Sequence, residues 1–202
     1  MTHLTTTSLA SYLDALAAAT PAPGGGSAAG VTGAMGAALV EMVAGLSLAK
    51  PDVASAEHSG LQRTALERAR SARVDLLQLA EDDAVAYGAF MEALRLPKTT
   101  SDERTARTSA ISAAAQRAAE VPLATLRATV AVAEAARSML DKSLLAAASD
   151  LEVAARFARA SGESAAENVE ANLPYIDDPQ TRAEIASQTS AALTALHRVT
   201  PQ

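Results

Sequence analysis

Residues 20–49 read TPAPGGGSAAGVTGAMGAALVEMVAGLSLA, a loop of prolines and glycines followed by a long run of small apolar residues. Residues 20–26 cannot be helical, because the prolines restrict the residues before them and the three glycines favour irregular backbone. Ser27 is predicted to cap a helix that ends at Lys50-Pro51. Because glycine and alanine fall on neighbouring turns of this helix, another backbone can approach it closely. The stretch therefore predicts a central helix in a helical bundle.

The composition supports the same fold class. Hydrophobic residues make up 49% of the 202 residues and aromatic residues only 2%, which suits closely packed helices better than sheets. The length fits a single domain, residues 1–202, built as an all-α, compact multi-helix bundle with a long central helix. A core rich in alanine buries little apolar area per residue. A homodimer, which would bury more, is therefore expected.

Proline, glycine and capping residues divide the rest of the chain into further predicted helices. A first helix follows Thr7 or Ser8 and stops before Pro21. The others are predicted at 55–96, 100–120 (with a Thr100/Glu103 capping box), 122–140 (opened by Pro122), 149–160 (ended by Gly162), 163–173, and from Asp178-Pro179 to the C-terminus.

One residue breaks the apolar face of the long helix predicted at 55–96. Asp83 stands on a stripe whose other members are all apolar. A buried carboxylate needs a partner, so Asp83 is either a structural group, paired with an arginine or capping a neighbouring helix, or a polar anchor in a functional site. The stripe consists of Leu61, Ala65, Ala69, Ala72, Leu76, Leu79, Asp83, Ala86, Phe90 and Leu94.

Charge and composition exclude several classes of function. The formal net charge is −6 with no basic cluster, which argues against a nucleic-acid partner. The chain has no cysteine, and its histidines lack metal-ligand spacing, so no metal site is predicted. The N-terminus does not resemble a signal peptide, and a cytoplasmic location is expected. Residues 27–49 are long enough to span a bilayer, but Gly and Ala insert poorly and Glu41 opposes insertion, so no membrane partner is predicted.

Three groups of polar residues have both a structural and a functional interpretation. The loop Pro23-Gly24-Gly25-Gly26-Ser27 precedes a helix N-terminus, which binds anions, yet it is also an ordinary tight turn without a P-loop lysine. Ser149-Asp150 fits a helix cap as well as a catalytic pair. Lys98 and Arg107 are typical solvated charges.

Taken in order, these residues resemble the formiminotransferase-cyclodeaminase C-terminal domain and the related bacterial methenyl-tetrahydrofolate cyclohydrolases. The resemblance covers about residues 8–178 and is most specific at residues 21–27 and the Ala/Gly helix that follows. Further matching positions are Asp83 with Tyr87, Leu96-Pro97-Lys98, Arg107, Val121-Pro122-Leu123, Ser149-Asp150 with Val153-Ala154-Ala155, Asn168-Val169 and Asn172-Leu173.

The resemblance implies a homodimeric, all-helical enzyme with a folate groove near the glycine-rich loop and no covalently bound cofactor. It implies substrate contacts at Pro23, Gly24, Gly25, Gly26, Ser27, Ser149, Asn168 and Asn172. Asp83 and Asp150 are the candidate acid and base, and Lys50, Lys98 and Arg107 are candidates for holding the glutamyl carboxylates.

The chain departs from the family pattern at two places. Residues 49–53 stand where the family has a Gly-Lys-Lys-Lys-Tyr stretch, and Ser143, Leu144 and Ala146 stand where it has Gly-Asn and a further Asn. The main prediction is a methenyl-tetrahydrofolate cyclohydrolase, because no formiminotransferase domain is fused to the chain. The alternatives are a formimino-tetrahydrofolate cyclodeaminase, or a diverged member with altered substrate or no catalysis.

Overall fold

The structure, a computed structural model, describes residues 4–50 and 52–200. Within those residues the regular elements are all helices, as the sequence predicts. The end predicted for the second helix at Lys50-Pro51 involves Pro51, which lies outside the described residues. The elements are η1 Leu4–Thr6, α1 Leu9–Ala17, α2 Gly25–Leu48, α3 Ala56–Arg95, α4 Ser101–Met139, η2 Leu145–Ala147, α5 Ala148–Asn172, η3 Leu173–Tyr175 and α6 Pro179–Val199.

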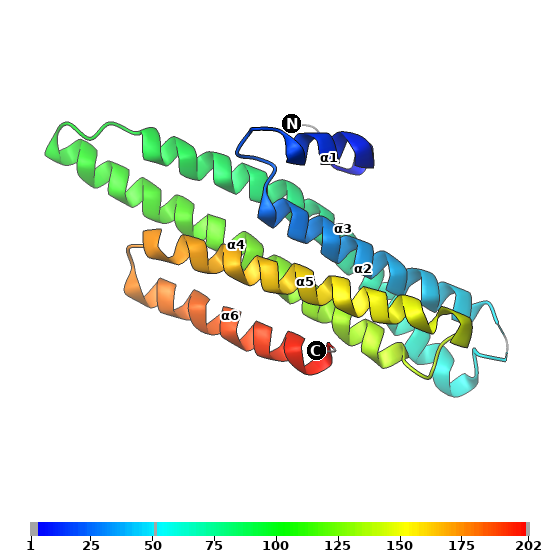
Figure 1. Ribbon diagram of the computed structural model, residues 1–202. Helices are drawn as coiled ribbons and strands as arrows, with labels where there is room; N and C mark the ends of the chain where they lie inside the picture. Colours follow the sequence, from blue (N-terminus) through cyan, green and yellow to red (C-terminus); the bar gives the residue numbers. More distant parts are fainter. Residues whose placement is uncertain (1–3, 51, 201–202) are drawn as a thin grey trace.

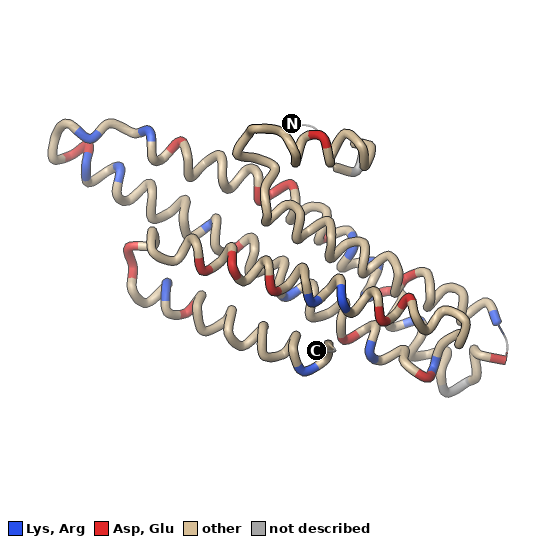
Figure 2. Tube along the Cα trace, in the orientation of Figure 1, with Lys and Arg blue, Asp and Glu red and all other residues tan. Residues whose placement is uncertain are grey.

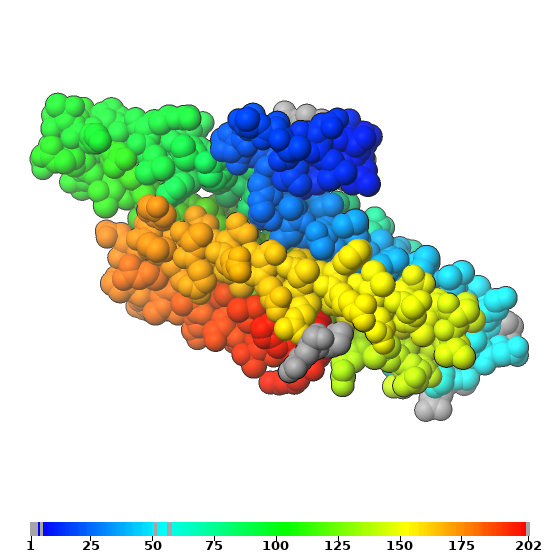
Figure 3. Space-filling model, in the orientation of Figure 1, coloured from blue at the N-terminus to red at the C-terminus, as the bar shows by residue number. Residues whose placement is uncertain are grey.

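The four long helices α2 to α5 run along the length of the molecule (Figure 1). Helix α2 packs against α3 and α5, and α4 packs against α3, α5 and α6. Helix α1 stands out from this bundle beside the arm formed by the end of α3 and the start of α4 (Figure 3). Charges of both signs are dispersed along the helices (Figure 2).

Glycines in α2 allow the close packing that the sequence predicts. A Cβ atom at Gly30 would lie 2.8 Å from the carbonyl oxygen of Leu76 in α3. A Cβ atom at Gly36 would lie 3.0 Å from the carbonyl oxygen of Ala154 in α5. Both distances are shorter than ordinary van der Waals contacts, so the absence of a side chain sets the separation of these helices. Helix α2 is thereby held between α3 and α5, with Ala37, Val40 and Val43 fully buried.

Helix α2 begins earlier than the sequence predicts. Gly24 is the N-cap residue and Gly25 is the first helical residue, so the predicted cap at Ser27 is wrong. Ser27 lies one turn inside the helix, where its backbone amide receives a partner from another helix. The glycine-rich loop is therefore partly the first turn of α2.

Helix α4 continues through Pro122, so the predicted division into helices at 100–120 and 122–140 is wrong. Proline inside a helix removes one hydrogen bond and crowds the carbonyl four residues earlier. Tertiary packing overrides that local cost here, because Val121, Pro122, Leu123 and Leu126 are all buried in the continuous helix. The predicted capping box at the start of α4, Thr100 with Glu103, is confirmed.

Helix α5 also continues through a residue predicted to end a helix. Gly162 is buried within α5, and the predicted helices at 149–160 and 163–173 are one element. A Cβ atom at Gly162 would lie 2.5 Å from Leu196 Cδ2 and 2.7 Å from Thr129 Oγ1. The glycine thus gives α4 and α6 room to approach α5 and has no capping role.

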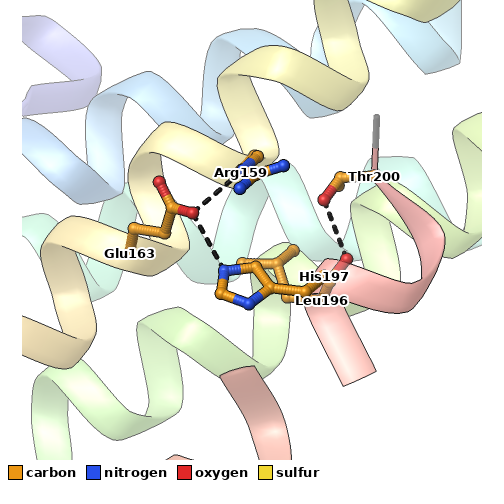
Figure 4. A network of polar contacts seen from close by, with 5 residues as sticks. All are labelled: Arg159, Glu163, Leu196, His197 and Thr200. Atoms are coloured by element: carbon orange, nitrogen blue, oxygen red, sulfur yellow. Dashed lines mark hydrogen bonds and ion pairs between the residues drawn. The ribbon is translucent and has the colours of Figure 1, made fainter. Parts of the chain in front are cut away.

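A polar network links α5 to α6 (Figure 4). Glu163 Oε1 lies 2.9 Å from both Arg159 Nε and His197 Nε2. Burial opposes ionisation of Glu163, but the hydrogen bonds and charges of Arg159 and His197 bring its pKa below the ordinary value. The network therefore ties the last turn of α6 to the middle of α5.

By length and composition, one helix among the described residues, α2, could cross a membrane. Core helices of bundles share these properties, and α2 packs between α3 and α5.

Candidate active site

A cleft of about 200 Å³ opens where the glycine-rich loop meets α3, α4 and α5. We call it the Asp83 cleft. The loop and the first turn of α2 form one wall, and α3 and the C-terminal end of α5 form the others. Gly25 and Asp83 both line the cleft, so the glycine-rich loop and the aspartate of the apolar stripe meet in it. The cleft is lined by Pro21, Ala22, Gly24, Gly25, Gly26, Asp83, Ala86, Tyr87, Phe90, Ala118, Asn168 and Asn172.

Asp83 is fixed in the cleft by the start of α2. Its Oδ2 accepts a hydrogen bond from the backbone amide of Ser27 at 3.1 Å. A Cβ atom at Gly26 would lie 2.1 Å from Asp83 Oδ1, so this carboxylate occupies the space that any side chain at position 26 would need. Asp83 thus caps a neighbouring helix and also lines the cleft. The structural interpretation is thereby confirmed, and the role of Asp83 as a polar anchor in a functional site stays a prediction.

The surroundings of Asp83 make its carboxyl group a weaker acid than an exposed aspartate. Burial raises the pKa of this carboxyl above its ordinary value, and the hydrogen bond from Ser27 opposes that rise only in part. A raised pKa makes a carboxyl group a better proton acceptor once it is ionised.

The first turn of α2 leaves backbone donors next to this carboxylate. The first hydrogen bond within the helix runs from Ala28 N to Gly24 O at 3.0 Å, so the amides of Gly25 and Gly26 have no acceptor within the helix. Such amides, together with the helix dipole, attract the oxygen atoms of a ligand.

Helix α3 supplies an apolar and aromatic wall. Tyr87 follows Asp83 by one turn, and Phe90 follows it by two, so all three face the cleft. The ring of Phe90 meets that of Tyr175 edge to face, with centroids 5.0 Å apart. Phe90 and Ala86 were predicted only as members of an apolar stripe. Their spacing from Asp83 was the signal that could have assigned them to the site.

Helix α5 supplies two amides one turn apart. Asn168 Nδ2 donates to Ser164 O at 2.8 Å. Asn172 Nδ2 donates to Asn168 O at 2.8 Å and to Ala118 O of α4 at 3.1 Å. Because these bonds use side-chain donors, the oxygens of both amides remain available as acceptors.

The predicted site residues divide between this cleft and other parts of the molecule. Gly24, Gly25, Gly26, Asp83, Asn168 and Asn172 line the Asp83 cleft. Pro23 and Ser27 line a second, larger cavity of about 530 Å³ between α1 and α3, which shares Ala22 with the cleft. Tyr12 of α1 is buried there, and its hydroxyl lies 3.2 Å from Ser27 Oγ.

Five predicted residues lie away from the cleft within this chain. Ser149 and Asp150 are in the first turn of α5, roughly 27 Å along the helix from Asn168 at 1.5 Å per residue. Lys50 follows the distal end of α2, as far from the loop as that helix is long. Lys98 is in the exposed loop between α3 and α4. Arg107 donates through Nη2 to Leu94 O at 2.9 Å, an interaction that holds the end of α3 to α4.

The cleft is suited to one kind of ligand. Its polar side chains offer one carboxylate, two amide oxygens and the hydroxyl of Tyr87, and in the described part of the chain its lining includes no lysine or arginine. A volume of about 200 Å³ is below the ~300–1,000 Å³ of pockets that enclose whole drug-sized ligands. The cleft is therefore sized for part of a larger molecule, and it offers hydrogen-bond acceptors on its side chains and donors on the backbone of Gly25 and Gly26. Among the described residues, no group of three or more His, Cys, Asp or Glu could hold a metal ion.

Comparisons with known proteins point in one direction. The family described as Formiminotransferase-cyclodeaminase matches residues 8–191. The chain is 41% identical over 167 residues to the methenyltetrahydrofolate cyclohydrolase of Methylorubrum extorquens, covering 83% of this chain and 79% of that protein. It is 32% identical to the formimidoyltransferase-cyclodeaminase of Sus scrofa over 85% of this chain, but it spans only 31% of that protein.

A solved structure has the same fold. The crystal structure of formiminotetrahydrofolate cyclodeaminase from Thermotoga maritima superposes with a TM-score of 0.86 at 26% identity. The match covers 96% of this chain and 92% of that one.

Proposed function

The chain belongs to the formiminotransferase-cyclodeaminase family, and on that basis we propose that it is a methenyltetrahydrofolate cyclohydrolase. One observation carries the proposal. A chain 41% identical to an enzyme of that name places a carboxylate with a raised pKa in a cleft beside the glycine-rich loop. The substrate is a tetrahydrofolate derivative, and no cofactor is bound covalently.

The reaction adds water to the carbon that bridges two folate nitrogens. Asp83 accepts a proton from the attacking water as its oxygen bonds to the bridging carbon, which gives a tetrahedral adduct. The carbon–nitrogen bond to one ring nitrogen then breaks as the adduct hydroxyl loses its proton and becomes the formyl C=O. The departing nitrogen takes up one proton, and the proton held by Asp83 is released to solvent. A positioned acid or base contributes typically 10²–10⁴-fold to the rate of such steps. Asp83 is also the negative charge that faces the cationic bridge in the ground state.

The start of α2 and the amides of α5 are proposed to orient the ring. The free amides of Gly25 and Gly26 can donate to ring or adduct oxygens. The oxygens of Asn168 and Asn172 can accept from ring N–H groups. The side of Phe90 and Tyr87 supplies the apolar surface on which a flat ring stacks.

A homodimer is proposed to complete the site. Met35, Met42 and Leu46 lie along the solvent-facing side of α2 and are each more than 40% exposed. A second copy that runs antiparallel along this face would bury the three side chains and would bring the distal end of one chain toward the cleft of the other. Lys50, Ser149 and Asp150, which lie at that distal end, would then act across the interface, with Asp150 as the second carboxylate.

The dimer has its own test, which does not depend on activity. Met42→Glu places a charge in the proposed interface, and light scattering should then report a monomer. Val74→Glu, at a residue of α3 that is 57% exposed, is the matched control and should leave the mass unchanged. If the wild-type protein is a monomer in solution, the proposed dimer is refuted, and so is the proposed role of Asp150 across the interface.

The remaining expectations follow from the same family assignment. Residues 1–202 are proposed to form one cyclodeaminase/cyclohydrolase-like helical domain that acts in the cytoplasm, with neither nucleic acid nor a membrane as partner. Lys98 and Arg107 are retained as candidates for the glutamyl tail, which extends beyond a cleft that fits only the ring.

A second candidate reaction is cyclodeamination, favoured by the TM-score of 0.86 to the Thermotoga maritima enzyme. In this reaction the second folate nitrogen attacks the carbon of the formimino group. Loss of ammonia from the resulting adduct gives the same bridged carbon on which the cyclohydrolase acts. The assay that separates the two follows methenyltetrahydrofolate decay and, in parallel, ammonia release from formiminotetrahydrofolate. Decay at the buffer rate would refute the cyclohydrolase, and ammonia release in that case would support the cyclodeaminase.

A further inference from the structure

Pro122 lies within α4, where it leaves the carbonyl of Ala118 without its usual partner. In a regular helix the amide of residue 122 donates to the carbonyl of residue 118, but proline has no amide hydrogen. The proline ring also crowds that carbonyl. The Ala118 oxygen instead accepts a hydrogen bond from Asn172 Nδ2 of α5, at 3.1 Å. Ala118 and Asn172 both line the Asp83 cleft.

The two hydrogens of the Asn172 side-chain amide are both engaged. One is donated to Ala118 O, and the other is donated to Asn168 O at 2.8 Å. Since both partners are carbonyl oxygens, only the nitrogen of the amide can face them, and the amide has one possible orientation. Its oxygen is therefore free to accept, and Asn172 has no donor left for a ligand.

We propose that Pro122 is a positioning residue that fixes Asn172 as a hydrogen-bond acceptor in the Asp83 cleft, and that Asn172 thereby selects a ligand with an N–H donor on that side. The ligand chemistry is a ring amide or ring amine, as a reduced pterin provides. This assignment of the ligand rests on the proposed function, whereas the positioning of Asn172 does not.

Pro122→Ala is the informative substitution. Alanine is a strong helix former, and α4 is already continuous at this position, so the variant is expected to fold. The restored amide at position 122 can donate to the Ala118 oxygen and so competes with Asn172 for it. Asn172 then loses one of its two anchors and can rotate. Pro179→Ala, at the first turn of α6, is the matched control.

The first experiment measures the Asn172 side-chain amide by nitrogen-edited NMR without ligand, with its signals identified by their loss in Asn172→Ala. Its two protons are expected to exchange with solvent at least tenfold faster in Pro122→Ala than in the wild type or in Pro179→Ala. An unchanged exchange rate in Pro122→Ala would overturn the positioning role.

The second experiment measures the Kd for methenyltetrahydrofolate in a double-mutant cycle. Pro122→Ala should raise the Kd at least fivefold when Asn172 is present and less than twofold in the Asn172→Ala background. An equal effect in both backgrounds would mean that Pro122 acts only through the shape of α4, and the proposal would fail. If the wild type binds no folate while the NMR result holds, the proposed function fails and the positioning of Asn172 stands.

Discussion

Asp83 and Ser27, 56 residues apart in the chain, are joined by a 3.1 Å hydrogen bond from the Ser27 backbone amide to the Asp83 carboxylate. This bond joins the middle of α3 to the first turn of α2 and places the carboxylate at the edge of the cleft. The same group therefore holds two helices together and faces the ligand. Substitutions of Asp83 or of the residues next to it can therefore distinguish its structural role from its role toward a ligand.

Substitution of Asp83 separates chemistry from capping. Asp83→Asn keeps an oxygen that accepts from Ser27 but removes the base and its buried charge, so turnover should fall more than tenfold while the Tm stays level or rises. Asp83→Ala removes both, and should also lose about 1 kcal/mol of stability, as for other helix caps. Steady-state kinetics and thermal unfolding by circular dichroism measure the two effects. A folded Asp83→Asn variant with full activity would exclude Asp83 from catalysis.

Gly26 should tolerate no side chain. In Gly26→Ala the new methyl group would lie 2.1 Å from Asp83 Oδ1, so the carboxylate must move and turnover should fall at least tenfold. Gly88→Ala on the exposed side of α3 is the control, because a Cβ atom there meets nothing within 4 Å. The control should keep its activity and gain about 0.5–1 kcal/mol from the better helix former. Equal activity of the two variants would contradict the fixed position of Asp83.

The pH dependence of kcat/KM should report Asp83. Burial raises the pKa of this carboxyl above 3.8, the ordinary value, and the base must be ionised to act. Activity should therefore fall as the pH decreases through a midpoint above 3.8, and Asp83→Asn should lack this limb. The sign for stability is opposite, since the folded state prefers the protonated form: the carboxyl destabilises the fold as the pH rises through its pKa. A midpoint at or below 3.8 would disagree with the buried position.

The network of Glu163 should stabilise the contact between α5 and α6 above acid pH. The pKa of Glu163 lies below its ordinary value of 4.5, so its contribution is complete above 4.5 and is lost as the pH falls through the lower, folded value. Because both Glu163 and His197 are more than 40% exposed, the effect should be below about 1 kcal/mol. Thermal unfolding against pH should show a smaller acid-dependent change in Tm for Glu163→Gln than for the wild type.

A second pair on α5 provides the comparison for that measurement. Glu152 contacts Arg156 at 3.3 Å within the same helix and makes no bridge to α6. Glu152→Gln should leave the Tm within about 1 °C of the wild type, because exposed pairs within a helix contribute little. If Glu152→Gln lowers the Tm as much as Glu163→Gln does, the contact of Glu163 with His197 of α6 adds no measurable stability.

The fold could be predicted where local signals and packing agree. The helix starts at Ser55, Thr100 and Asp178 are confirmed, and Ser8 is the cap of the two candidates Thr7 and Ser8. Each cap depends on a side chain close in sequence to the amide that it binds. The helix ends predicted near Pro122 and Gly162 are wrong. Both residue types usually interrupt helices, which is why the sequence predicts a break at each. Here burial against neighbouring helices keeps the helix continuous at both positions, and this information lies far away in the sequence.

The site could be predicted where one helix face carries it. A carboxylate on an apolar stripe identified Asp83, and the order of small motifs identified the loop and the two asparagines. The distances between helices could not be read from the sequence. Thus Asp150 and Lys50, which lie at the far ends of α5 and α2, were grouped with residues that this chain alone does not bring near them.

Asp83 both accepts a hydrogen bond from the start of α2 and faces the cleft, and this affects how distant relatives are interpreted. A copy that had drifted away from folate chemistry would still need an acceptor for the free amide at that helix start, and a glycine at position 26 to make room for it. An aspartate retained in such a copy is thus weak evidence that it is still an enzyme.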